Sequence, residues 1–198
     1  MMSEAPSQTR SADQILAIET RDITGLSTTQ IIVLAIDQLA ALTTGQIAAM
    51  NTMQIAALTT LNVQNFSTFQ IRAIEAIDIS GFNTAQIAVL SDEQFSTLTS
   101  IQISALNTLQ IPAINVVIRS VQIAALSASQ IAAFNTAQLN AWGSEHISAI
   151  ETRDIAGLTT TQIAALTFNQ WSALSTGQIA ALNTAQLSVL TTADIQSM

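Results

Sequence analysis

The sequence predicts an all-α solenoid, a superhelix of very short helices of about two turns each, with one helix per eight-residue repeat. Three observations support this prediction. An octad of the form [Ser/Thr/Asn]-Thr-x-Gln-Ile-x-Ala-Leu repeats without a gap over residues 11–114 and again over 119–198. A helix-start signal recurs in nearly every octad. Large apolar residues recur at its fifth and eighth positions.

Positions 1 and 4 of the octad predict where each helix begins. Position 1 is mostly Ser, Thr or Asn, and position 4 is Gln in 17 of the 23 octads. Residues of these types three apart form a capping box, in which each side chain binds the backbone N–H of the other residue. A β-solenoid is the alternative, because Thr and Ile suit strands, but the segment Gln-Ile-Ala-Ala-Leu lacks the alternation of a strand.

Positions 5 and 8 supply the predicted core. Both are apolar in all 23 octads, and residues three apart lie on one face of a helix. Position 7 is usually Ala or Gly, which lets a neighbouring helix approach closely, and position 3 is expected to face outward. Because an isolated two-turn helix is marginal, stacking between coils must stabilise the array.

The chain is expected to consist of a disordered leader and one repeat array. Residues 1–10 are polar and contain Pro6, which is typical of such a leader, and the array covers 11–198. Longer blocks are inferred at 11–66, 67–142 and 143–198. The middle block contains an irregular insertion at 115–118, directly after an octad in which Pro112 removes a helix donor. We expect a kink or bulge there and no domain boundary.

Three octads carry Glu at position 1, Asp at position 4 and Gly at position 7. They cover residues 19–26, 75–82 and 151–158, and the 56 residues between the first two suggest a longer repeat of seven octads. Their carboxylates could bind Ca²⁺, which prefers oxygen ligands, but Asp near a helix start also favours the helix dipole. The second interpretation is preferred, so no metal and no cofactor are predicted. The weak metal candidates are Glu19, Asp22, Glu75, Asp78, Glu151 and Asp154.

Position 3 becomes apolar in the middle of the array. If it faces outward, these residues form an exposed patch of the kind that marks interaction sites; alternatively, curvature of the array buries them. The candidate interaction residues are Met53, Leu61, Phe69, Ile77, Ile101, Leu109 and Val121.

Composition argues against several classes of function. A single histidine, His146, and the absence of Cys and of a phosphate-binding loop predict no catalytic residues and no enzyme activity. A net charge of −8 with only five basic residues argues against nucleic acid as a partner. No apolar stretch approaches the length of a membrane-spanning helix, so no membrane insertion is expected. Trp142 and Trp171 occupy positions 8 and 5 of their octads, so both are expected to pack in the core.

The octads TTGQIAAM, NTMQIAAL, TTTQIAAL and STGQIAAL resemble Thr-x-Gln-Ile-Ala-Ala-Leu repeat tracts of large bacterial proteins. Many of those proteins are predicted to be secreted or attached to the cell surface, so the resemblance weakly favours an extracellular or surface location. No N-terminal signal peptide is visible in the sequence. The resemblance implies no activity and no site residues.

We therefore expect a non-enzymatic structural or scaffolding array that binds a protein or associates with itself. One alternative is an ice-binding or surface-binding array, because regularly spaced Thr hydroxyls at positions 1 and 2 could form a flat, weakly charged face. A second alternative is a calcium-binding module that uses the acidic octads.

Overall fold

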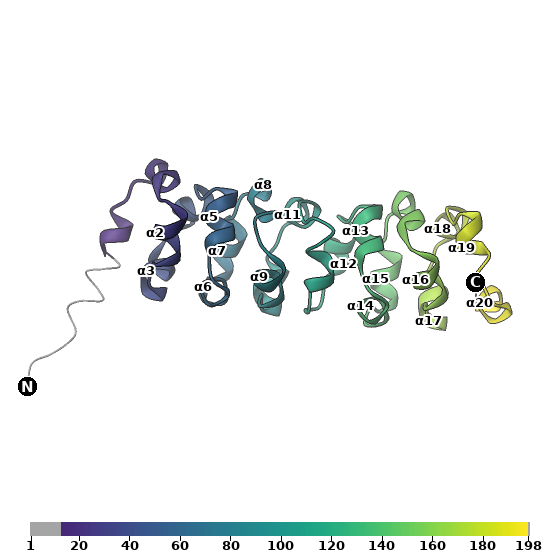
Figure 1. The fold of residues 1–198 in the computed structure, drawn as a ribbon. Helices are drawn as coiled ribbons and strands as arrows, with labels where there is room; N and C mark the ends of the chain where they lie inside the picture. Colours follow the sequence, from purple (N-terminus) through teal and green to yellow (C-terminus); the bar gives the residue numbers. More distant parts are fainter. Residues whose placement is uncertain (1–12, 198) are drawn as a thin grey trace, which may run out of the picture. The chain divides into compact units, whose positions relative to one another are not determined.

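The computed structural model describes residues 13–197 and confirms an all-helical solenoid of short helices. The described residues contain no strand. The predicted leader at 1–10 lies outside the described residues. Contacts divide the chain into two compact units that meet between Ala105 and Leu106, here called the N-terminal and C-terminal units. Figure 1 shows the short helices of each unit winding in successive coils.

The N-terminal unit contains one 3-10 helix followed by short α-helices, one in each octad. These are η1 (Thr20–Gly25), α2 (Thr28–Ile32), α3 (Ile36–Ala41), α4 (Thr44–Ala48), α5 (Thr52–Ala57), α6 (Thr60–Asn65), α7 (Thr68–Ala73), α8 (Ala76–Ile79), α9 (Thr84–Ala88), α10 (Asp92–Ser96) and α11 (Ser100–Ser104).

The C-terminal unit has the same construction, with two 3-10 helices among its elements. These are η2 (Ile111–Ala113), α12 (Ser120–Ile123), α13 (Ala128–Ala133), α14 (Thr136–Asn140), α15 (Ser144–Ser148), η3 (Thr152–Gly157), α16 (Thr160–Ala164), α17 (Phe168–Trp171), α18 (Thr176–Ala180), α19 (Thr184–Leu187) and α20 (Thr192–Ser197).

The helices begin where positions 1 and 4 predict. At the start of α4, Thr43 Oγ1 accepts from the backbone N–H of Gln46, and Gln46 Oε1 accepts from the backbone N–H of Thr43. The same reciprocal bonds start α9 at Asn83 and Gln86. Each helix ends within its own octad; Leu58, for example, follows α5 with ψ of 140° and has left the helical conformation. Each octad therefore holds one helix, and the next cap follows directly.

Each helix packs on the helix three octads earlier. Contacts join α2 to α5, α5 to α8, and α8 to α11, so that these four helices form one stack of the N-terminal unit. The side chain at position 4 reaches one octad further back: Gln54 donates to the carbonyls of Ile23 and Leu26, which are 31 and 28 residues earlier. One coil thus holds about three and a half octads, and the 56-residue repeat corresponds to about two coils.

The core runs along the inside of these coils. Position 5 is buried in every octad from Ile15 to Trp171, and position 8 is buried from Leu42 to Leu182. Phe95 and Trp171 are its largest fully buried side chains. This burial confirms the division of the octad into core-facing and surface-facing positions.

The irregular segment 115–118 takes the place of a whole octad. Gln130 donates to the carbonyl of Leu106 across only 24 residues, four fewer than in regular coils of the same chain, where the separation is 28. Ile118 is 2% exposed, so it fills a position-8 place in the core. In the octad before it, Pro112 lies in η2, a 3-10 helix of three residues, which replaces the regular α-helix. The coil is shortened without losing its core layer.

Candidate interaction surfaces

All seven apolar position-3 candidates lie at the surface. Their exposed fractions range from 52% for Leu61 to 77% for Leu109. They do not form one patch, because successive octads point to different sides of the coil. Side chains become neighbours along a stack only when they are three octads apart, as the contacts between helices require.

Three of the candidates meet on one stack of the N-terminal unit. Met53 on α5, Ile77 on α8 and Ile101 on α11 are 70–75% exposed, and their helices contact one another in sequence. We call these three residues the apolar row. The position-6 residues of the same helices are uncharged and are Ala56, Ser80 and Ser104. The row is therefore an apolar ridge without charged residues at the flanking position 6.

The other four candidates lie apart from the row. Leu61 belongs to the stack of α3, α6 and α9, and Phe69 belongs to the stack of η1, α4, α7 and α10. Leu109 and Val121 belong to the C-terminal unit. Sequence reasoning missed further exposed apolar residues, among them Val33 at 74%, Val117 at 68% and Phe168 at 69%. Their signal was a large apolar side chain where the octad does not require one.

In two of the three acidic octads, the aspartate accepts a hydrogen bond from the preceding coil. Asp154 Oδ1 accepts from the backbone N–H of Ala128 at 3.0 Å, at the start of α13 in the preceding coil. Asp78 Oδ1 accepts from Thr52 Oγ1 at 2.5 Å, at the start of α5. Whereas Gln at this position donates to the end of a helix, Asp accepts from the start of one. The glycine at position 7 allows this approach: a Cβ at Gly81 would lie 2.5 Å from the carbonyl oxygen of Thr52.

In two of these acidic octads, an arginine forms ion pairs with the carboxylates. Arg153 pairs with Glu151 at 3.2 Å and with Asp154 at 3.0 Å, and Arg21 pairs with Glu19 at 2.7 Å. The hydrogen bond that Arg153 donates to Asp154 and the negative charge of Glu151 raise the pKa of the Arg153 guanidinium. Within residues 13–197, no three His, Asp or Glu side chains gather closely enough to hold a metal ion. Five of the six weak metal candidates have hydrogen-bond or ion-pair partners within the protein; these are Glu19, Asp22, Asp78, Glu151 and Asp154.

His146 takes the place of a capping glutamine. Its Nδ1 accepts from the backbone N–H of Gly143 at 2.9 Å, as the side-chain oxygen of Gln does in other octads. Trp142 packs edge-to-face on Phe134, with ring centroids 4.9 Å apart. Trp171 is 1% exposed, and in the described part of the chain its Nε1 has no hydrogen-bond partner.

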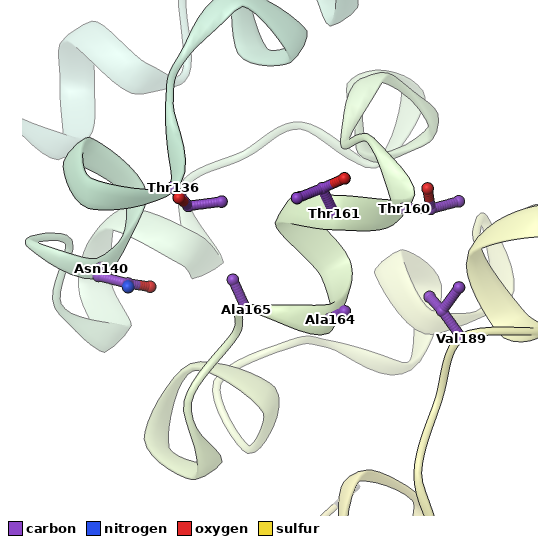
Figure 2. Close-up of a pocket in the computed structure, with 7 residues that line it drawn as sticks. All are labelled: Thr136, Asn140, Thr160, Thr161, Ala164, Ala165 and Val189. Atoms are coloured by element: carbon purple, nitrogen blue, oxygen red, sulfur yellow. The ribbon is translucent and has the colours of Figure 1, made fainter.

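The C-terminal unit has a shallow, open groove lined by threonine and small residues. Figure 2 shows Thr136 and Asn140 of α14 on one side, and Thr160, Thr161 and Ala164 of α16 beyond them. Ala165 and Val189 complete the lining. Position 2 of the stacked helices α14, α16 and α19 is threonine each time: Thr136, Thr160 and Thr184. We call these three residues the threonine row; no charged side chain lines the groove.

No helix within the described residues has the length and apolar character needed to cross a bilayer. A search of curated proteins and a search of solved structures gave no match. The family model of the ALTTAQ repeat matches residues 15–52, 32–68, 71–108 and 147–184, which together cover more than half of the sequence. The chain therefore belongs to the ALTTAQ repeat family.

Proposed function

We propose that the chain is a non-enzymatic scaffold whose apolar row binds the apolar face of an amphipathic helix in a partner protein. The supporting observation is that Met53, Ile77 and Ile101 are 70–75% exposed on three helices in contact. An exposed apolar ridge is costly in water and is typical of a surface that another protein covers.

The spacing of the row favours a helix as the occupant. Packed helices lie about 8–10 Å apart, so successive side chains of the row are separated by about that distance. A helix rises about 1.5 Å per residue, so residues seven apart are separated by about 10 Å. An amphipathic helix with an apolar residue at every seventh position would therefore match the row side chain by side chain.

The lack of charge at position 6 beside the row favours an apolar contact over an ionic one. Ala56, Ser80 and Ser104 carry no charge, although the whole chain has a net charge of −8. Binding through the row should consequently change little with salt concentration, since charge screening acts on ionic contacts.

Fluorescence anisotropy with a labelled helical peptide tests the proposal. The peptide presents Leu at every seventh position, and a matched peptide presents the same residues in scrambled order. We expect the first peptide to bind the parent chain and Ile77→Asp to weaken binding at least tenfold. Phe69→Asp is the control, because Phe69 is equally exposed, at 75%, but lies on another stack. Equal affinity of both variants, or of both peptides, would contradict the proposal.

A second candidate function, binding to ice or another regular solid surface, is supported by the threonine row. Thr136, Thr160 and Thr184 occur at the same position of three stacked helices, beside an uncharged groove. Thermal hysteresis of the parent chain tests this function, with Thr160→Asp as the disrupting variant. Absence of hysteresis in the parent would remove this candidate without affecting the first.

A further inference from the structure

The three acidic octads differ in one respect that bears on the apolar row. In the first and third of them, position 3 is arginine, and Arg21 and Arg153 pair with the glutamate at position 1 of the same octad, at 2.7 Å and 3.2 Å. In the second, at 75–82, position 3 is Ile77, the middle residue of the row. A row residue thus stands where the other two octads carry the arginine that pairs with their glutamate.

Glu75 of this second octad has no ion-pair partner among the described residues. Its side chain is exposed and, within the described chain, makes no capping hydrogen bond to α8. Its backbone has φ of −64° and ψ of 145°, close to −64° and 143° at Glu151, so the two glutamates precede their helices in the same conformation. Because the arginine at position 3 reaches Glu151, a cation placed over Ile77 lies within reach of Glu75.

A partner helix on the apolar row changes the environment of this carboxylate. Ile77 is 75% exposed, and a helix that covers it also removes water from Glu75, two positions earlier in the chain. A carboxylate that loses water without gaining a partner is destabilised, whereas a basic side chain of the partner offsets that loss. A neutral or acidic side chain in the same place offers no such compensation, so Glu75 discriminates among partner helices.

The charge of the whole chain acts in the same direction. Its net charge is −8, and none of its five arginines lies on α5, α8 or α11, the helices that carry the row. A negative protein attracts a positively charged partner during encounter, and charges placed at the contact then select that partner over others. A basic helix is therefore favoured both on approach and once it is bound.

We infer that the partner helix of the proposed function is basic, and that a lysine or arginine within one turn of its central apolar residue pairs with Glu75 while that residue contacts Ile77. The inference rests on the proposed function and adds the chemical class of the partner. Residues three or four apart on a helix lie about 5–6 Å from each other on one face, so the apolar and the basic side chain can make both contacts together.

Fluorescence anisotropy with four labelled peptides tests this pairing. Each peptide presents Leu at every seventh position. Three of them differ only in the two residues that lie three and four positions after the central Leu, which are both Lys, both Gln or both Glu. The fourth, the far-face peptide, exchanges the two Lys with two Gln on the opposite face of the helix. We expect the parent chain to bind the lysine peptide about three- to fivefold more tightly than the glutamine or far-face peptide, and the glutamate peptide most weakly.

Variants of Glu75 establish whether this residue is the source of the preference. Glu75→Gln should bind the lysine and glutamine peptides equally, and Glu75→Lys should prefer the glutamate peptide. Glu93→Gln and Glu93→Lys are the controls, because Glu93 is also exposed and its replacement changes the net charge by the same amount, but it lies on another stack. Both controls should still prefer the lysine peptide. Raising the salt concentration should weaken this preference and leave the affinity of the glutamine peptide unchanged, since screening acts on the ion pair.

The outcomes separate this inference from the proposed function. Circular dichroism melting establishes that each variant is folded. If the lysine, glutamine and glutamate peptides bind equally well, the inference is overturned and the proposed function stands. A preference that survives Glu75→Gln, or that Glu93→Gln also removes, overturns the inference as well, because it then comes from net charge alone. If no peptide binds, both are overturned.

Discussion

The side-chain amide of Gln86 donates a hydrogen bond of 2.7 Å to the carbonyl oxygen of Leu58, 28 residues earlier in the chain. Its nitrogen also donates to the carbonyl of Ile55 at 3.0 Å, while its oxygen accepts from the backbone N–H of Asn83 at 2.7 Å. Gln86 is 1% exposed, and these three bonds satisfy its side chain. One residue thus starts its own helix and fastens it to the preceding coil.

Replacing this glutamine with glutamate should separate its two roles. In Gln86→Glu the carboxylate can still accept from Asn83, but it cannot donate, and its charge lies against the carbonyls of Ile55 and Leu58. We expect a loss of about 3 kcal/mol in the free energy of unfolding, since a buried charge then faces two carbonyl oxygens and keeps only one hydrogen-bond donor. Urea unfolding followed by circular dichroism measures this loss.

Gln30→Glu is the matched control for that change. Gln30 caps α2 in the same way but is exposed and donates to no carbonyl in the described chain. Its replacement should alter the free energy of unfolding by less than about 0.5 kcal/mol. Equal losses in the two variants would show that the bonds between coils add nothing to capping.

The glycines of the octads should respond in opposite directions to alanine. A Cβ at Gly157 would lie 2.5 Å from the Cα of Ala128, in the backbone of the preceding coil, so Gly157→Ala should destabilise the chain by about 1–3 kcal/mol. Gly177 in α18 has no atom closer than 3.7 Å to such a Cβ. Gly177→Ala should therefore stabilise by about 0.5–1 kcal/mol through helix propensity. Thermal melting of the two variants side by side checks the sign; a common direction would contradict the close approach at Gly157.

Local features of the fold could be predicted from sequence, because they depend on residues three or four apart. The capping pair of Ser27 and Gln30 and the apolar positions 5 and 8 are of this kind. The number of octads in a coil could not be predicted, since it is fixed by bonds such as that from Gln86 to Leu58. The capping box alone accounts for glutamine at position 4. Its second role, donation of hydrogen bonds to the preceding coil, needs the same residue at the same position and so could not be recognised in the sequence.

The candidate surface was predictable residue by residue but not as an arrangement. An apolar side chain at position 3 identified Met53, Phe69 and Ile77, yet only Met53 and Ile77 lie on the same stack of helices. Grouping them requires knowing how many octads separate two stacked helices. The eight-residue period of the sequence does not give that number. For the same reason, the hydrogen bond that Asp154 accepts from the backbone N–H of Ala128 could not be distinguished from an effect of the carboxylate on the helix dipole.

The two Glu-Thr-Arg-Asp segments allow the role of the aspartate between coils to be measured. Asp154 is 7% exposed and accepts from the backbone N–H of Ala128, so Asp154→Ala should cost about 1–2 kcal/mol by leaving that N–H unpaired. Asp22 has the same local sequence, but its side chain is 63% exposed and contacts Arg21 at 3.8 Å. Asp22→Ala should cost less than about 0.5 kcal/mol, as for other surface ion pairs. Urea unfolding of both variants at low and high salt measures the loss of stability. If the two variants lose similar amounts at low salt and neither loses stability at high salt, the stabilisation comes from the ion pairs with arginine and not from the hydrogen bond between coils.

The two tryptophans should differ in their tolerance of phenylalanine. Trp171 is 1% exposed, and among the described residues its Nε1 has no hydrogen-bond partner, so burying this N–H costs free energy. Trp171→Phe removes that cost while it removes apolar contacts, and the two effects offset each other to within about 1 kcal/mol. Trp142→Phe weakens an edge-to-face contact with Phe134 and should cost about 0.5–1.5 kcal/mol more than the first change.

Fluorescence of the same two variants gives an independent readout, because the chain has only two tryptophans and each variant reports the other one. In Trp142→Phe, the remaining emission of Trp171 should lie to the blue of the parent and resist quenching by acrylamide, since Trp171 is 1% exposed and its Nε1 has no hydrogen-bond partner among the described residues. In Trp171→Phe, emission should shift to the red, because Trp142 is 7% exposed. Strong quenching of Trp171 would mean that water reaches its Nε1. Burial of the Trp171 N–H would then cost no free energy, and there would be no physical reason to expect Trp171→Phe to be tolerated better than Trp142→Phe.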